Sequence, residues 1–183
     1  MSGPAARWGC FGKLLMIALL ISALAGCAKP KTGRIDPESA RQGDMVAAVR
    51  QGTLSFDTGI TVGDAFDHYG GFVVKWNEWD HFQTQNRRNI VEFKGHMDLR
   101  QADLSDAAID RLEKVIFTTQ FAAKVDGGLE VRYMGFVMKA QGGLEKEYAV
   151  SKGNQGHYLK AIYGNYKFSN AKYEFIIQNM VLN

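Results

Sequence analysis

The residues that could bind a metal ion are few and widely spaced in this chain. It contains two cysteines and four histidines, namely His68, His81, His96 and His157. No pair of them has the spacing by which one helix face presents two imidazoles to zinc. The sequence therefore predicts neither a metal site nor a cofactor.

Nucleophilic catalysis is also not indicated. In Trp79-Asp80-His81 a carboxylate adjoins an imidazole, but neighbouring side chains of a strand point to opposite faces and make a poor catalytic pair. The chain lacks the Gly-x-Ser-x-Gly turn that exposes a nucleophilic serine. Turn or helix-cap roles explain the serines more simply, namely Ser55, Ser105, Ser151 and Ser169. We expect a protein that is not an enzyme and has no identified small-molecule substrate.

Cys27 has the clearest local signature in the chain. Leu24-Ala25-Gly26-Cys27 closes an uncharged apolar stretch, Leu14–Leu24, that follows Arg7 and Lys13. This resembles the lipobox of bacterial prolipoproteins, whose cysteine thiol receives a diacylglyceryl group before cleavage on its amino side. The resemblance implies lipidation of Cys27 and membrane attachment through that lipid.

Two alternatives for this leader stay open. Ala23-Leu24-Ala25 also fits an ordinary secretory cleavage site, which would release a soluble product beginning at Gly26. An uncleaved anchor would need roughly 20 apolar residues, more than Leu14–Leu24 supplies. Ala28, in place of Asp, is similar to the sorting pattern of many lipoproteins of the Gram-negative outer membrane. If the host is Gram-negative, we therefore expect the anchor in the outer membrane, with the protein facing the periplasm.

The predicted organisation is a signal peptide over residues 1–26, a lipidated flexible tether over 27–44 and one α+β domain over 45–183. Removal of the leader takes away Cys10, so the domain would have no disulfide. The domain would also be nearly neutral, which argues against a nucleic-acid partner. Arg87-Arg88 is predicted to lie in a solvated hairpin loop, with contact to anionic headgroups or peptidoglycan carboxylates as the alternative.

The first half of the domain follows a helix-then-hairpin pattern. A short helix is expected near Pro37 to Val49, and Thr61 is expected to cap a second helix that Gly70-Gly71 ends. Phe72–Phe82 is predicted as a strand with a shift of apolar parity, which indicates a bulge or a sheet edge. Alternating apolar residues over 91–99 predict its partner strand.

A similar pattern follows in the second half. Ser105 is expected to cap a helix that carries Ile109, Leu112 and Val115 on one face. Alternation over 115–123, glycines at 127–128 and a return strand over 129–139 predict a second hairpin. Farther on, we expect helical turns at 158–163 and a last strand over 173–181.

The predicted fold class is therefore α+β, an antiparallel sheet with helices packed on one face, built from two consecutive helix-hairpin (α-β-β) units. This order is similar to that of small outer-membrane assembly lipoproteins of the BamE type and of the β-lactamase-inhibitor-like fold. The similarity implies an expectation about the fold and none about function.

Trp76 and Trp79 are the candidate binding surface. A regular strand would point them to opposite faces, so one indole would lie away from the core. An exposed indole could anchor a protein or stack on a sugar. The leading hypothesis is a noncatalytic lipoprotein that binds an envelope protein. A peptidoglycan or glycan binder and a small envelope hydrolase are the alternatives.

Overall fold

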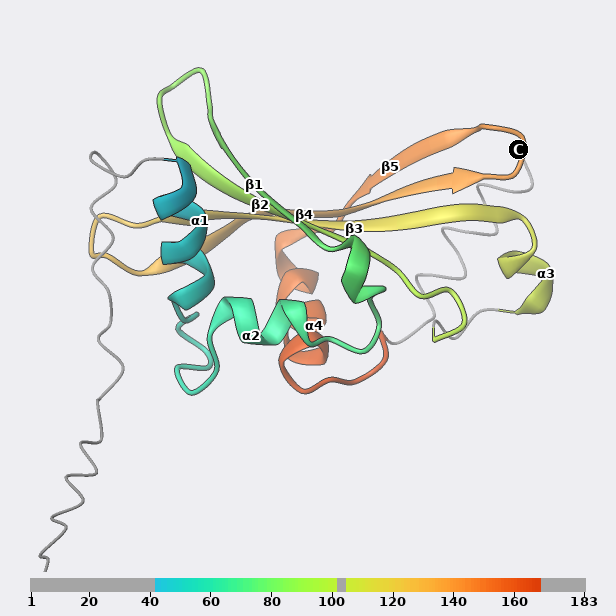
Figure 1. Cartoon of the computed structure of the whole chain (residues 1–183), viewed down its shortest axis with the longest axis horizontal. Helices are drawn as coiled ribbons and strands as arrows, with labels where there is room; N and C mark the ends of the chain where they lie inside the picture. Colours follow the sequence, from blue (N-terminus) through green and yellow to red (C-terminus); the bar gives the residue numbers. More distant parts are fainter. Residues whose placement is uncertain (1–41, 102–104, 169–183) are drawn as a thin grey trace, which may run out of the picture. The chain divides into compact units, whose positions relative to one another are not determined.

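The computed structural model describes residues 42–101 and 105–168, all of which belong to one compact unit. Its centre is a five-stranded antiparallel sheet in which the strands stand in chain order (Figure 1). The strands are β1 (Glu78–Gln83), β2 (Asn89–His96), β3 (Leu112–Ala123), β4 (Leu129–Ala140) and β5 (Glu145–Ala149). The mixed α+β class with an antiparallel sheet is therefore confirmed.

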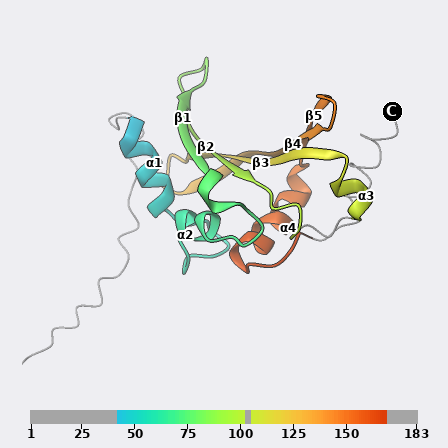
Figure 2. The same ribbon diagram turned by 45° about the vertical axis from the view of Figure 1, so that its right-hand side comes forward.

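Three helices lie on the same side of this sheet in both ribbon views (Figures 1 and 2). They are α1 (Gln42–Gln51), α2 (Val62–Asp67) and α4 (Lys152–Tyr163). Two shorter elements complete the described fold, the 3-10 turn η1 (Val74–Trp76) and the single-turn helix α3 (Asp106–Ile109). Among the residues described, no helix is long and apolar enough to cross a membrane.

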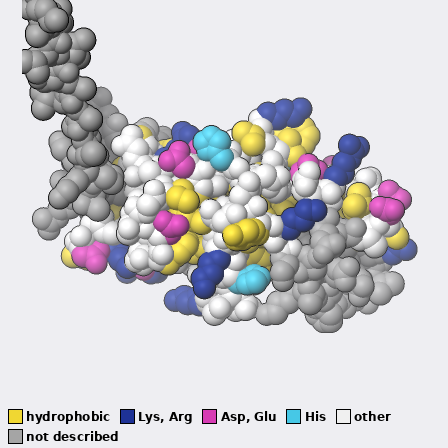
Figure 3. Space-filling model, turned by 90° about the horizontal axis from the view of Figure 1, so that it is seen from below, with side chains coloured by type: hydrophobic (Ala, Val, Ile, Leu, Met, Phe, Trp, Pro, Cys, Tyr) yellow, Lys and Arg dark blue, Asp and Glu magenta, His cyan; other side chains and the backbone are white. Residues whose placement is uncertain are grey.

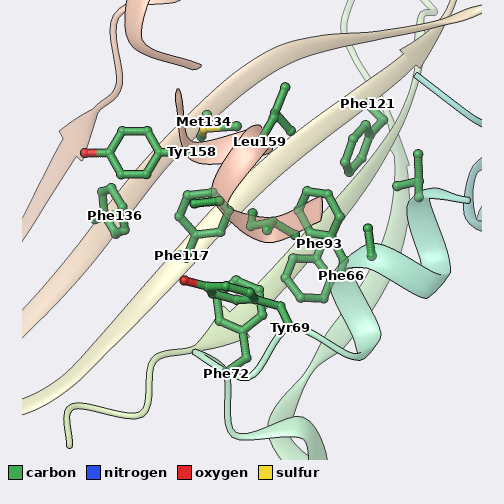
Figure 4. Close-up of a cluster of buried hydrophobic side chains, with 14 of the residues drawn as sticks. Phe66, Tyr69, Phe72, Phe93, Phe117, Phe121, Met134, Phe136, Tyr158 and Leu159 are labelled. Atoms are coloured by element: carbon green, nitrogen blue, oxygen red, sulfur yellow. The ribbon is translucent and has the colours of Figure 1, made fainter. Parts of the chain in front are cut away.

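The core between sheet and helices is rich in aromatic rings (Figure 4). Phe66 of α2 packs edge-to-face on Phe93 of β2 and Phe121 of β3, with ring centroids 5.0 and 5.3 Å apart. Phe136 of β4 packs 5.5 Å from Tyr158 of α4. Offset and edge-to-face aromatic pairs stabilise beyond the area they bury, so these contacts fix the helices against the strands.

The predicted helix start at Thr61 is confirmed. The Thr61 hydroxyl oxygen accepts a hydrogen bond from the Asp64 backbone N–H at 3.0 Å, the usual arrangement of an N-cap. Its apolar positions Val62, Ala65 and Phe66 are buried. The helix ends at Asp67, shortly before the two glycines at which the sequence predicts its termination.

The two predicted hairpins are also confirmed. β1 and β2 pair from Gln83 opposite Asn89 onward, and β3 and β4 pair over most of their length. Gly127 has φ of 85° in the second turn, where a side chain would strain the backbone. The alternation expected over 91–99 places Val91 and Phe93 in the core.

The continuous strand predicted over Phe72–Phe82 is wrong. Phe72 forms only an isolated bridge with Met97, and the chain then winds through η1 before β1 begins at Glu78. The inserted turn accounts for the parity shift between the two tryptophans. The accompanying expectation of a sheet edge is confirmed, since β1 is an outermost strand.

The helix predicted from Ser105 through Val115 is also too long. It ends at Ile109, and Leu112 and Val115 are buried residues of β3. A register irregularity between Leu112 and Lys114 turns both Leu112 and Val115 inward, which imitates helical spacing. Because α3 has no buried residue, two equivalent helix-hairpin units are not confirmed.

Near the two ends of the domain, the bounds and the number of the observed elements differ from those predicted. α1 begins at Gln42, inside the tether predicted over 27–44. α4 covers Lys152–Tyr163 instead of 158–163, and β5 has no counterpart in the prediction. The strand predicted over 173–181 lies outside the described residues, as does Ser169.

Candidate functional site

Trp79 belongs to the core-facing side of β1. It stands opposite Phe93 in the register, and the two ring centroids are 4.8 Å apart. The indole N–H donates a hydrogen bond to the carboxylate of Asp67 at 2.8 Å. The guanidinium of Arg50 lies 5.8 Å from the centre of the indole ring and is also paired with Asp67. Both the apolar and the polar part of this indole are therefore satisfied within the protein.

Trp76 is on the surface. Its side chain is 51% exposed, at the end of η1. The Lys75 ammonium lies 4.8 Å from the ring centroid, and the His96 ring lies edge-on at 5.7 Å. η1 is anchored from its N-cap residue, since the Val73 N–H donates to the His96 carbonyl at 2.8 Å. A hydrogen-bonded turn at the side of the sheet thus presents an accessible indole.

A shallow recess of about 430 Å³ surrounds this indole. Besides Trp76 it is lined by Lys75, Asn77, Glu78, His96, Glu113 and Lys114. Glu113 is paired with Lys139 at 2.7 Å. With charges of both signs, an aromatic face and an amide, the recess suits stacking and hydrogen bonding more than the capture of one strong charge.

Asn77 adds an unusual feature to the recess. Its side-chain nitrogen and oxygen are both shielded from solvent, and neither has a hydrogen-bond partner in the part of the chain that the structure describes. A buried polar group left without a partner costs roughly 1–3 kcal/mol. Because both atoms are closed off from solvent, a ligand in the recess would remove that cost only if the Asn77 side chain turned toward it.

The side of the sheet away from the helices carries a network of polar contacts. Glu92 accepts a hydrogen bond from Gln120 at 2.7 Å and pairs with Lys94 at 3.0 Å, and this contact raises the Lys94 pKa. The Tyr133 hydroxyl donates to Glu147 at 2.5 Å. Burial, followed by this hydrogen bond, raises the Tyr133 pKa. These partners hold the middle of the sheet face in place.

Figure 3 views the opposite, helical side. Single acidic and basic side chains are scattered among apolar ones there, and neither sign gathers into a patch on the part that is coloured. Within the described residues, no group of three or more histidine, cysteine, aspartate or glutamate side chains could hold a metal ion. The scattered charges and the lack of such a group among these residues therefore give no indication of a further site on the helical side of the sheet.

The remaining sequence candidates lie apart from the recess. The backbone N–H of His81 donates to the Asp80 carboxylate at 2.7 Å, and the Nε2 atom of the His81 ring lies 3.1 Å from the side-chain oxygen of Asn89. Ser105 and Ser151 are helix N-caps, as the sequence predicts. The structure thus brings Trp76 together with His96 and Asn77, and separates it from Trp79.

Sequence reasoning missed Lys75, Asn77 and His96 as parts of a site. They come together only because η1 interrupts the segment that alternation assigns to a strand. The one usable signal was the parity shift between the tryptophans, which indicates an irregularity without specifying its shape.

No protein family, no curated protein and no solved structure matches this chain.

Proposed function

We propose that this protein is a lipid-anchored component of a bacterial cell envelope. The support is the resemblance of Leu24–Cys27 to a lipobox, with Cys27 as the lipidated residue. The proposal places the domain in the periplasm, attached to the outer membrane if the host is Gram-negative. In this arrangement the domain acts on partners within reach of the membrane.

We further propose that it is a noncatalytic binding protein whose partner is another envelope protein. The observation that carries this is the half-exposed Trp76 indole, held by a hydrogen-bonded turn beside an edge strand. Tryptophan is enriched among the few residues that dominate protein interfaces, because it presents a large rigid area with little entropy to lose. The position and rigidity of Trp76 match that role.

The neighbouring edge of β1 extends this surface. Among the described residues, β1 is an outermost strand of the sheet. Glu78 and Asp80 are exposed on this strand, and charges of this kind discourage unselective strand pairing. A partner protein that contacted these side chains would have to supply complementary charges, which would make the contact selective.

A glycan is the second candidate ligand, and Asn77 favours it. Sugars combine an apolar ring face with hydroxyl groups that both donate and accept hydrogen bonds. The Trp76 ring would stack on the former, while the Asn77 amide, once turned toward the recess, would bind the latter. Peptidoglycan fragments that quench Trp76 fluorescence and block protein capture would favour this candidate over the protein partner.

Site-specific crosslinking in the native envelope tests the protein-binding proposal. A photoreactive amino acid replaces Val74, which is 58% exposed in the same turn as Trp76. The matched control replaces Leu144, which is 47% exposed in the β4–β5 turn and is not among the residues that line the recess. We expect one discrete protein adduct from position 74 and none of the same size from position 144. Identical adducts from both positions would contradict a Trp76-centred interface.

A further inference from the structure

A second concave surface lies where the β1–β2 and β3–β4 hairpins turn. It has a volume of about 820 Å³ and is bordered by Gln83 and Asn89 of the first hairpin and by Ala123 of the second. The Trp76 recess borders Glu78, the other end of β1. The two concavities therefore lie at opposite ends of the edge strand. We call this second surface the hairpin groove.

The hairpin groove is strongly cationic. Its charged residues are Arg87, Arg88, Lys124, Arg132 and Glu130. Arg132 and Glu130 neutralise one another in an ion pair at 3.0 Å. Within the described residues, Arg87, Arg88 and Lys124 have no acidic partner at ion-pair distance. Three positive charges thus face one opening on a domain whose overall charge is close to neutral.

Arg87 occupies a backbone position that arginine does not favour. Its φ is 57°, in the left-handed region where glycine or asparagine would be less strained. Strain of this kind in a turn is a reason to look for a role of the side chain. Here it places a cation at the rim of the groove.

Val125 forms the other part of the rim and is fully exposed at the β3–β4 turn. An apolar side chain that protrudes next to three cations matches the layered chemistry of a membrane surface. There, phosphate groups lie just outside the first methylene groups. A phosphate ion in solution would pair with the cations but would not bury the apolar surface of Val125.

The position of the groove in the fold agrees with this chemistry. Helix α1, the first described element, lies against β1 at this end of the sheet (Figures 1 and 2). Gln42 begins α1 fifteen residues after Cys27, the proposed site of lipidation. Fifteen residues span at most about 50 Å, which allows this end of the domain to reach the bilayer from an anchor at Cys27.

We propose that the hairpin groove binds the phosphate groups of anionic lipids, with Val125 entering the headgroup layer. This inference rests on the membrane location in the proposed function but uses none of the residues of the Trp76 recess. Contact at this end of β1 directs the Trp76 end away from the bilayer, toward a partner. The groove would thereby set the orientation in which the domain presents its binding surface.

The test follows the environment of position 125 in the full chain. The chain is reconstituted through its own N-terminal segment into vesicles, with an environment-sensitive fluorescent amino acid in place of Val125. One vesicle set is phosphatidylcholine and the other contains about 30% phosphatidylglycerol, both with brominated acyl chains as quenchers. Because each cation near an anionic surface contributes roughly a fivefold preference, we expect at least about tenfold more of the quenched form on anionic vesicles.

Two triple variants separate the groove from general charge. Arg87→Gln, Arg88→Gln and Lys124→Gln together should reduce quenching on anionic vesicles to the neutral level. The control changes three exposed cations elsewhere, Arg100→Gln, Arg111→Gln and Lys152→Gln, and should retain it. Equal loss in both triple variants, or equal quenching on both vesicle types, would overturn the proposal.

Two further arms identify the ligand. Inorganic phosphate that abolishes quenching, where chloride of equal ionic strength does not, would assign the groove to a soluble anion and overturn the membrane assignment. A change in the fluorescence at position 125 that occurs only when other envelope proteins are added would identify an acidic protein as the ligand. This result would also overturn the membrane assignment. Trp76→Ala should leave the quenching unchanged, so failure of the groove and failure of the Trp76 interface give different results.

Discussion

Trp76 and Trp79 lie on one short segment and have opposite surroundings. Trp79 is packed against Phe93 and hydrogen-bonded to Asp67, whereas Trp76 is half exposed beside Lys75 and His96. The difference arises from η1, which ends at Trp76, because β1 starts only after it. The same residue type therefore packs against the core at position 79 and is available to a ligand at position 76. The backbone geometry of the segment determines this difference.

Replacing Trp79 with alanine is the strongest test of this contrast. The change would remove ring contacts with Phe93, Phe66 and Phe121 and leave a cavity between β1 and α2. We expect Trp79→Ala to lower the free energy of unfolding by on the order of 3–5 kcal/mol, measured by chemical denaturation. A loss below about 1 kcal/mol, the range of surface changes, would show that this indole is not part of the core.

The polar partner of Trp79 should have the next largest effect. Asp67→Ala leaves the indole N–H without its acceptor and the Arg50 guanidinium without its partner. We expect a loss of about 1–2 kcal/mol, toward the lower end of the cost of an unpaired donor because this indole is partly buried. Asp110→Ala makes the same charge change at an exposed position and should alter stability by less than about 0.5 kcal/mol. Similar losses in both variants would mean that the Trp79–Asp67 contact contributes nothing.

Trp76→Ala should have the smallest effect on stability. Because half of this side chain is exposed and the described contacts to it are with surface residues, we expect a change under about 0.5 kcal/mol. Thermal melting of Trp76→Ala and Trp79→Ala under identical conditions gives the comparison directly. A melting temperature as low for Trp76→Ala as for Trp79→Ala would make both indoles structural.

The sequence predicted the elements that depend on local signals. The Thr61 cap, the alternation around Phe93 and the glycine turn at 127 each have a short-range physical cause, and all three are found in the structure. The Ser105–Val115 helix was wrong because an irregular register at the start of β3 gives inward positions a helical spacing. Local periodicity cannot distinguish these two origins.

The candidate site was predicted only in part, for a related reason. Sequence parity indicated that one of Trp76 and Trp79 would be exposed, but only η1 determines which one. In the recess, Asn77 comes from the end of η1 and His96 from the end of β2. The hairpin groove likewise combines two turns that are far apart in the sequence. Proximity of this kind arises from strand pairing, which the composition of each segment does not encode.

The most direct test of the central claim measures crosslinking from position 74 in chains that carry tryptophan, phenylalanine or alanine at position 76. We expect the adduct to be strong with tryptophan, reduced with phenylalanine and lost with alanine, at melting temperatures that agree within the small change expected for a surface residue. An adduct of unchanged yield in a folded Trp76→Ala protein would contradict the account, because the interface would then lie elsewhere on the domain.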